Sequence, residues 1–166
     1  MIELSTDDFL WFVDDCLTEM VEIVTGLGDE LANTRPSLPG ANSPYAILTH
    51  CLAMMTWWSG EAVAGHPVQR DRDAEFVATG PVAEMPELVA GARRRFLADL
   101  HHLEPAAPIT TEPEHHYAGT PYGRTQAGVL MHVFHELAQH LGQMEITRDV
   151  LVASTDRRNR RLVRDV

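Results

Sequence analysis

A group of histidines and one glutamate around position 136 has the residue types and the spacing of a metal site. Glu136 and His140 are four residues apart, so on a helix they lie about 40° apart and one turn apart in height. Two ligands at this spacing can bind one metal ion, as in the HExxH arrangement. His132, one turn before Glu136, is a possible fourth or outer ligand. His135 points about 140° away from His140 and cannot share an ion with it.

The same pair also admits an interpretation without metal, because a buried carboxylate and imidazole stabilise each other when they are hydrogen-bonded. A third ligand has to come from another helix. His50 borders the apolar stripe of the segment that begins at Ser43, although a single histidine there is more often a core residue. Together, His50, Glu136 and His140 form a set of three protein ligands, which is typical of a catalytic zinc site with one open position. Imidazole and carboxylate ligands also suit nickel, which a crystal could contain in place of zinc.

Five of the nine histidines are less informative. We expect them to be solvated, or to stabilise a helix C-terminus where imidazolium suits the helix dipole. They are His66, His101, His102, His115 and His116.

Four amphipathic segments must position the candidate ligands. They run from Thr6 to Gly26, from Ser43-Pro44 to Gly60 or Gly65, from Pro86 to Leu103, and from Thr125 to Ala153. In each segment apolar residues recur every three or four positions, which is the period of a helix with one buried face. No segment alternates with a period of two. We therefore predict an all-α protein, a four-helix bundle.

The predicted core is the apolar stripe of each segment, and Thr6 is the predicted N-cap of the first. The stripes are Phe9, Val13, Cys16, Met20, Ile23 and Leu27; Ile47, Cys51, Met54 and Trp58; Leu88, Ala92, Phe96, Leu100 and Leu103; and Leu130, Val133, Leu137, Leu141 and Met144.

The remaining segments are predicted to be loops and a tail. Residues 35–42, 66–81 and 104–123 are rich in proline, glycine and polar residues, which favours loops. Residues 1–155 are assigned to one bundle domain, because 166 residues suit a single core. Residues 156–166, with their run of arginines, are predicted to be a basic, solvated C-terminal tail.

The composition excludes several classes of partner. Twenty-four acidic residues against thirteen basic ones give a net charge of −11, which disfavours nucleic acid and anionic membrane surfaces. Every basic residue is an arginine, so lysine Schiff-base chemistry and a P-loop lysine are excluded. The chain has no basic signal-peptide start and no apolar run long enough to span a membrane. Cys16 and Cys51 are expected to be reduced core thiols, and the protein to be cytoplasmic.

Three tryptophans lead us to expect a homodimer. Two packed helix faces need fewer large aromatic side chains than the chain provides in Trp11, Trp57 and Trp58. Two-fold pairing is also the commonest assembly.

The order and separation of several motifs resemble the DinB-like superfamily. The residues that carry this resemblance are Pro39–Pro44 and Leu48–Leu52, then Arg70–Phe76, and finally the helical run that ends in His140-Leu141-Gly142-Gln143. The similarity is greatest to the actinobacterial branch that includes the mycothiol S-transferases and the N-terminal domain of mycothiol-dependent maleylpyruvate isomerase.

The resemblance implies a four-helix bundle with long crossover connections and a divalent metal ion. One histidine of the second helix, His50, and two residues one turn apart on the fourth helix, Glu136 and His140, would bind that ion. Many DinB-like proteins have a histidine where this chain has Glu136. The S-transferase branch usually continues with Gly-His-x-Asp, whereas this chain continues with Gly142-Gln143-Met144-Glu145.

The expected activity is metal-dependent transfer of a low-molecular-weight thiol, mycothiol, to an electrophile. A metal-bound thiol loses its proton and becomes a nucleophile. Arg148, two turns past His140, is expected either to contact a carboxylate or sugar of the thiol or to form an ion pair with Glu145 or Asp149. Two alternatives are a metal-dependent hydrolase or isomerase that uses metal-bound water, and a non-catalytic, stress-related binding protein.

Overall fold

The structure is a computed structural model that describes residues 4–112 and 117–164, and in that part of the chain it contains helices and no strand. Four long helices form the bundle: α1 (Thr6–Ala32), α2 (Pro44–Trp57), α4 (Met85–Leu100) and α5 (Gln126–Arg164). A short helix, α3 (Arg72–Glu75), lies between α2 and α4. The predicted all-α, four-helix-bundle fold is confirmed.

Three short helical segments extend or join the long helices. A π-helix, η1 (Trp58–Ala64), continues α2 and ends at Gly65, one of the two predicted ends. Gly65 has a left-handed conformation with a φ of 73°, which glycine adopts without steric cost. The 3-10 turns η2 (Val82–Glu84) and η3 (Pro121–Gly123) precede α4 and α5.

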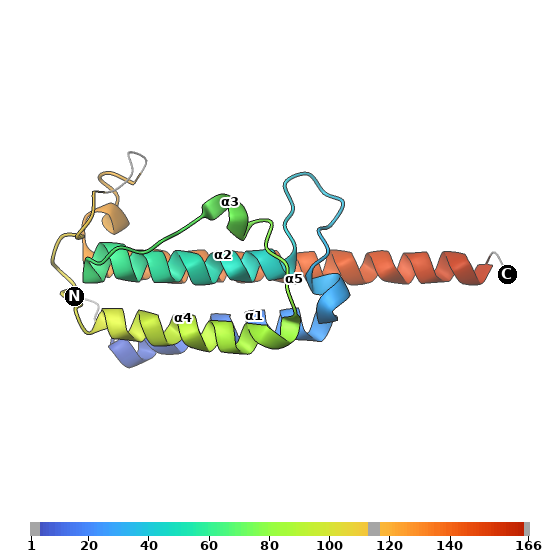
Figure 1. Cartoon of the computed structure of the whole chain (residues 1–166), viewed down its shortest axis with the longest axis horizontal. Helices are drawn as coiled ribbons and strands as arrows, with labels where there is room; N and C mark the ends of the chain where they lie inside the picture. Colours follow the sequence, from blue (N-terminus) through green and yellow to red (C-terminus); the bar gives the residue numbers. More distant parts are fainter. Residues whose placement is uncertain (1–3, 113–116, 165–166) are drawn as a thin grey trace.

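The chain between α2 and α4 is a long crossover. Figure 1 shows α2 and α4 running in the same direction, so the chain returns along the length of α2 before α4 begins. α1 and α5 run in the opposite direction, and α5 continues well past the other helices (Figure 1). The crossover carries α3 back beside α2, and this return path brings a charged segment next to His50.

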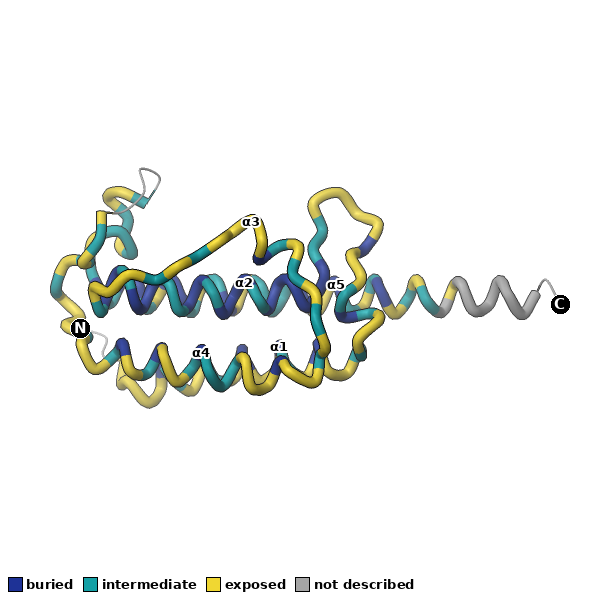
Figure 2. Tube along the Cα trace, in the orientation of Figure 1, coloured by how far each residue is buried: buried dark blue, intermediate teal, exposed yellow. Residues whose placement is uncertain are grey.

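The core lies where the predicted apolar stripes meet. α2 packs against α1, α4 and α5, and the crossover covers another part of it, so most of its residues are buried (Figure 2). The stripes of α1, α2 and α5 are buried or half-buried as predicted. Leu88 is an exception: it was expected to point inward, but it is 46% exposed because the adjoining space between α2 and α4 is a hollow.

Several helix boundaries differ from the prediction. Ser5, and not Thr6, caps α1, because its hydroxyl accepts a hydrogen bond from the Asp8 amide. The chain kinks at Gly28, with a φ of 68°, and then resumes a helix as far as Ala32. α5 does not end at Ala153 but continues to Arg164, so the backbone of most of the predicted tail is helical. Ser43 caps α2 with Pro44 in its first turn, as predicted.

Both cysteines are free thiols in the core, which confirms the prediction. Among the described helices, none is both long and apolar enough to cross a membrane. His115 and His116 lie outside the described residues.

Candidate metal centre

His50 occupies a buried position in the middle of the bundle. It lies on α2, is 3% exposed, and faces α5. Its ring stacks on Phe76 from the crossover, with ring centroids 4.4 Å apart. An apolar ring on one side and α5 on the other leave His50 little freedom to rotate.

A buried carboxylate fixes which ring nitrogen of His50 faces α5. Nδ1 lies 2.7 Å from Oε2 of Glu75, the last residue of α3. Arg70 donates from Nε to Oε1 of the same carboxylate at 2.7 Å and from its guanidinium to Oε2 at 3.0 Å. Nδ1 is therefore engaged, and Nε2 is left as the nitrogen that can bind a ligand.

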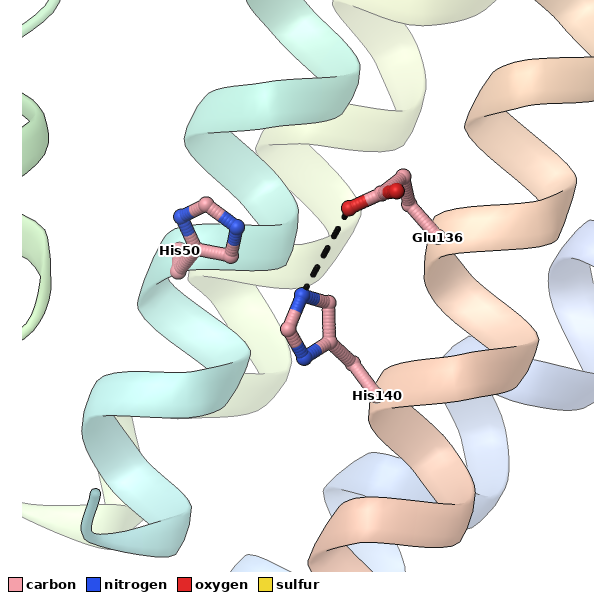
Figure 3. A group of neighbouring side chains, drawn as sticks. All are labelled: His50, Glu136 and His140. Carbon is pink, nitrogen blue, oxygen red and sulfur yellow. Dashed lines mark ion pairs between the residues drawn. The ribbon is translucent and has the colours of Figure 1, made fainter. Parts of the chain in front are cut away.

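Glu136 and His140 approach His50 from α5. Oε2 of Glu136 lies 3.6 Å from Nε2 of His140, and the rings of His140 and His50 are 5.0 Å apart between centroids. Figure 3 shows the three side chains converging from the two facing helices. Nδ1 of His140 is hydrogen-bonded to Oε1 of Gln143 at 2.8 Å. Nε2 of His140 is therefore the nitrogen that is left to face Glu136 and His50.

One ligand atom from each of the three residues lies within 4.8 Å of the other two. Two atoms bound to a tetrahedral zinc ion at about 2.1 Å are about 3.4 Å apart, so small side-chain movements would complete the geometry. Two imidazole nitrogens and one carboxylate oxygen are a donor set that suits zinc. The residues therefore fit a divalent ion.

The centre is open on the side of α5. The side chain of Glu136 is 27% exposed and that of His140 is 20% exposed, whereas His50 is closed off. Glu136 and His140 are therefore the two residues of the group that solvent reaches.

Burial and the contacts among the three residues shift their pKa values in different directions. Burial is the main cause that lowers the pKa of His50, which keeps its imidazole neutral and able to bind metal. The contact with Glu136 raises the pKa of His140, and the same contact lowers the pKa of Glu136. Below the raised pKa of His140 these two side chains form an ion pair, and an ion that binds there replaces a proton on His140.

Glu75 and Arg70 support the centre by holding His50, although no residue pattern in the sequence indicated them as site residues. Burial raises the pKa of Glu75, but hydrogen bonds from Arg70 and His50 outweigh it and lower the pKa overall. The carboxylate is therefore ionised and holds His50 in place. Residues 70–76 lie in the predicted loop 66–81, and only the family resemblance singles them out.

His132, a possible outer ligand, lies in a different environment. Its Nδ1 is 4.0 Å from Oε1 of Glu136, but it is not part of the group of three. Its ring stacks on Tyr122 at 4.4 Å and packs edge-on against Trp58 at 4.9 Å. It is buried with a lowered pKa, for which burial is the main cause, and it supports the far side of Glu136.

Arg148, the predicted contact for the thiol cofactor, is not brought to the group of three. Its Nε donates to Oδ1 of Asp149 at 2.9 Å, which is one of the ion pairs the sequence left open. It lines a hollow of about 400 Å³ between α1 and α5 together with Glu19 and Glu22. The role of Arg148 in binding a cofactor stays a prediction.

The four-helix bundle with its long crossover, and the His/Glu/His group between α2 and α5, have the arrangement that the resemblance to the DinB-like superfamily implied. A chain of this fold from Enterococcus faecalis, described as a conserved protein, has a crystal structure with a TM-score of 0.65. It is 15% identical in sequence, and the match covers 92% of this chain and 99% of that one. At this identity the likeness concerns the fold alone.

The family model described as mycothiol S-transferase matches residues 8–153. The chain therefore belongs to the mycothiol S-transferase family. No curated protein sequence matches it significantly.

Proposed function

We propose that this protein is a metal-dependent transferase that joins a low-molecular-weight thiol, mycothiol, to an electrophilic substrate. His50, Glu136 and His140 would hold one divalent ion, zinc. The observation that carries this proposal is the arrangement of two imidazoles whose Nδ1 atoms are engaged by Glu75 and Gln143, beside a carboxylate on the open side. Membership of the mycothiol S-transferase family supports it.

The bound ion would supply one chemical function: it would bind the sulfur of the thiol and keep it deprotonated at neutral pH. The protein's own thiols do not offer that nucleophile. Cys16 and Cys51 are buried, and burial raises the pKa of both. A thiolate for transfer must therefore come from a second substrate.

The protein side chains hold and shield the reacting position. Arg70 fixes Glu75, and Glu75 fixes the His50 ring, so the nitrogen facing α5 has a set direction. Gln143 does the same for His140. Phe76 covers the face of His50 and keeps water from that side. The S-transferase branch usually has a histidine at the position of Gln143; here the amide oxygen of Gln143 accepts a hydrogen bond from Nδ1 of His140.

The proposal is tested with protein purified without an affinity tag and loaded with zinc. Mycothiol and a generic aromatic halide are added, and thiol, halide and conjugate are measured together. We expect one thiol to be consumed for each conjugate formed, and we expect His140→Ala to lose both zinc and conjugation. Turnover of substrate without thiol consumption would instead indicate a hydrolase or isomerase that uses metal-bound water.

We also propose that the protein acts in the cytoplasm, where small thiols remain reduced. The substrates are two small molecules, and the net charge of −11 argues against a nucleic-acid partner.

A further inference from the structure

A second cluster of polar side chains lies in a hollow between α2 and α4, apart from the candidate metal centre. The hollow has a volume of about 700 Å³ and its lining includes Thr56, His66, Val68, Leu88, Arg95 and Asp99. None of the three candidate ligands lines it. This volume is within the range of small-molecule sites. We call it the α2–α4 hollow.

One wall of the hollow is held in place by a buried carboxylate. Asp99 is buried on α4; its Oδ2 accepts a hydrogen bond from Ser59 at 2.6 Å, and its Oδ1 lies 2.8 Å from Nε2 of His66. A buried carboxylate is costly unless it is paired, and here both oxygens have partners. His66, expected from the sequence to be merely solvated, is thereby fixed at the rim.

The segment after η1 is fixed by further contacts. The Val68 amide donates to Oε1 of Glu61 at 2.7 Å, and the His66 amide donates to the Gly60 carbonyl at 3.0 Å. Gly60 permits this approach, because a Cβ there would lie 2.5 Å from a methyl of Val68 and 2.8 Å from Cε1 of His66. The hollow is thus bounded by a well-anchored segment and two packed helices.

A further charged residue that lines the hollow is Arg95 on α4. Three arginines follow one another on α4. Arg93 pairs with Asp14 and Arg94 pairs with Glu87. Among the residues that the structure describes, no acidic side chain forms an ion pair with Arg95. Both oxygens of Asp99 already bond to Ser59 and His66, so the exposed side chain of Arg95 leaves the hollow with an unpaired positive group.

The rest of the lining is largely apolar. Leu88, which is large and exposed at this site, Val68 and the α2 residues Leu52 and Ala53 contribute apolar surface. The guanidinium group of arginine matches a carboxylate in shape and charge. We propose that the α2–α4 hollow binds a small molecule that joins an apolar body to a carboxylate, with Arg95 contacting the carboxylate and Leu88 and Val68 contacting the apolar body.

The test compares 2-naphthoate with 2-naphthalenemethanol, which has the same apolar body and no charge. Binding to the metal-free protein is measured by calorimetry, and the site is mapped from the methyl NMR signals of Leu88 and Val68. We expect 2-naphthoate to bind more tightly than the alcohol and to shift these methyl signals. We expect Arg95→Gln to weaken 2-naphthoate binding by about tenfold or more, the effect of losing a charge-assisted hydrogen bond, and to leave binding of the alcohol unchanged.

Arg94→Gln is the matched control, because Arg94 is the neighbouring arginine, is exposed, and pairs with Glu87. It should leave 2-naphthoate binding unchanged. The proposal is overturned if 2-naphthoate does not bind, if the alcohol binds as tightly, if both arginine variants have the same effect, or if the shifted signals lie elsewhere. Loading the protein with zinc should not change the affinity, so this test is independent of the proposed transferase activity.

Discussion

Glu75 is expected to control how tightly the candidate centre binds zinc, because its carboxylate fixes the ring of His50. Glu75→Gln replaces the ionised acceptor with a neutral amide, and the affinity for zinc should fall by about 10- to 100-fold, the usual effect of removing such a supporting group. A competition titration against a coloured zinc chelator measures this. Asp73→Asn is the control, since Asp73 is an exposed acid of the same short helix. Equal losses in both variants would contradict the orienting role of Glu75.

Zinc affinity should also depend on pH, in a direction set by His140. The contact with Glu136 raises the pKa of His140, and zinc needs the neutral imidazole. Below that raised pKa, each bound ion displaces one proton, so the affinity should fall by about tenfold per pH unit as the pH decreases. Burial lowers the pKa of His50, so His50 adds no proton until the pH is lower still. A titration series from about pH 8 to pH 5 checks this; an affinity that does not change over that range would contradict it.

The residues of the centre differ in how far the sequence could predict them. Glu136 and His140 could be paired because the period of a helix places residues four apart side by side. His50 required a second helix, and its apolar stripe indicated the correct face. Glu75 could not be found from a pattern, because a crossover has no period and its partner His50 is 25 residues away. The pairing of His66 with Asp99, 33 residues apart, was missed for the same reason.

At the scale of the elements, two glycines of α5 should respond in opposite ways to alanine. At Gly128 a Cβ would overlap the carbonyl oxygen of Pro121, a backbone atom of η3. Gly128→Ala should therefore destabilise the protein by about 1–3 kcal/mol, as overpacking does. At Gly142 nothing lies within 4 Å of the added Cβ. Gly142→Ala should stabilise the protein by about 0.5–1 kcal/mol, because alanine loses less entropy in a helix.

Urea denaturation of the two variants and the parent protein measures these changes in the free energy of unfolding. A neutral effect of Gly128→Ala would show that η3 does not need to approach α5 so closely. A loss of stability in Gly142→Ala would show that the helix is strained at that position.

The helices themselves were predictable because four apolar stripes with a period of three to four residues had to meet in one core. The differences arise where local and tertiary effects compete. The first helix is predicted to end at Gly26, but it continues to a kink at Gly28 and then resumes as far as Ala32, which is buried. α3 is only four residues long, too short for a period to be visible. The basic residues after Ala153 mark no helix end, and α5 continues through them.

At the scale of the whole molecule, a homodimer remains a prediction. Two of the three tryptophans that suggested a dimer pack within one chain, since Trp58 is buried and Trp57 is half-buried. Trp11 is 60% exposed, packs edge-on against the exposed Phe12, and leaves an apolar face on α1. Light scattering should give the mass of a dimer, and Trp11→Asp should give the mass of a monomer because a buried charge would oppose the contact. A monomer mass for the parent protein at micromolar concentration would refute the dimer.

The division of the chain into a bundle domain of residues 1–155 and a basic tail also remains a prediction. α5 crosses that boundary without a break in its helix. The part that carries the candidate metal centre lies wholly within the segment matched by the mycothiol S-transferase family, residues 8–153.

The measurement that tests the metal centre and its proposed chemistry together is X-ray absorption at the zinc edge, with and without mycothiol. In the zinc-loaded protein without thiol, we expect two imidazole nitrogens and one carboxylate oxygen at about 2.0–2.2 Å. Adding mycothiol should introduce one sulfur at about 2.3 Å while both imidazoles remain bound. Zinc that binds without the two imidazoles, or a spectrum that mycothiol leaves unchanged, would contradict the proposal that His50, Glu136 and His140 hold an ion that binds the thiol.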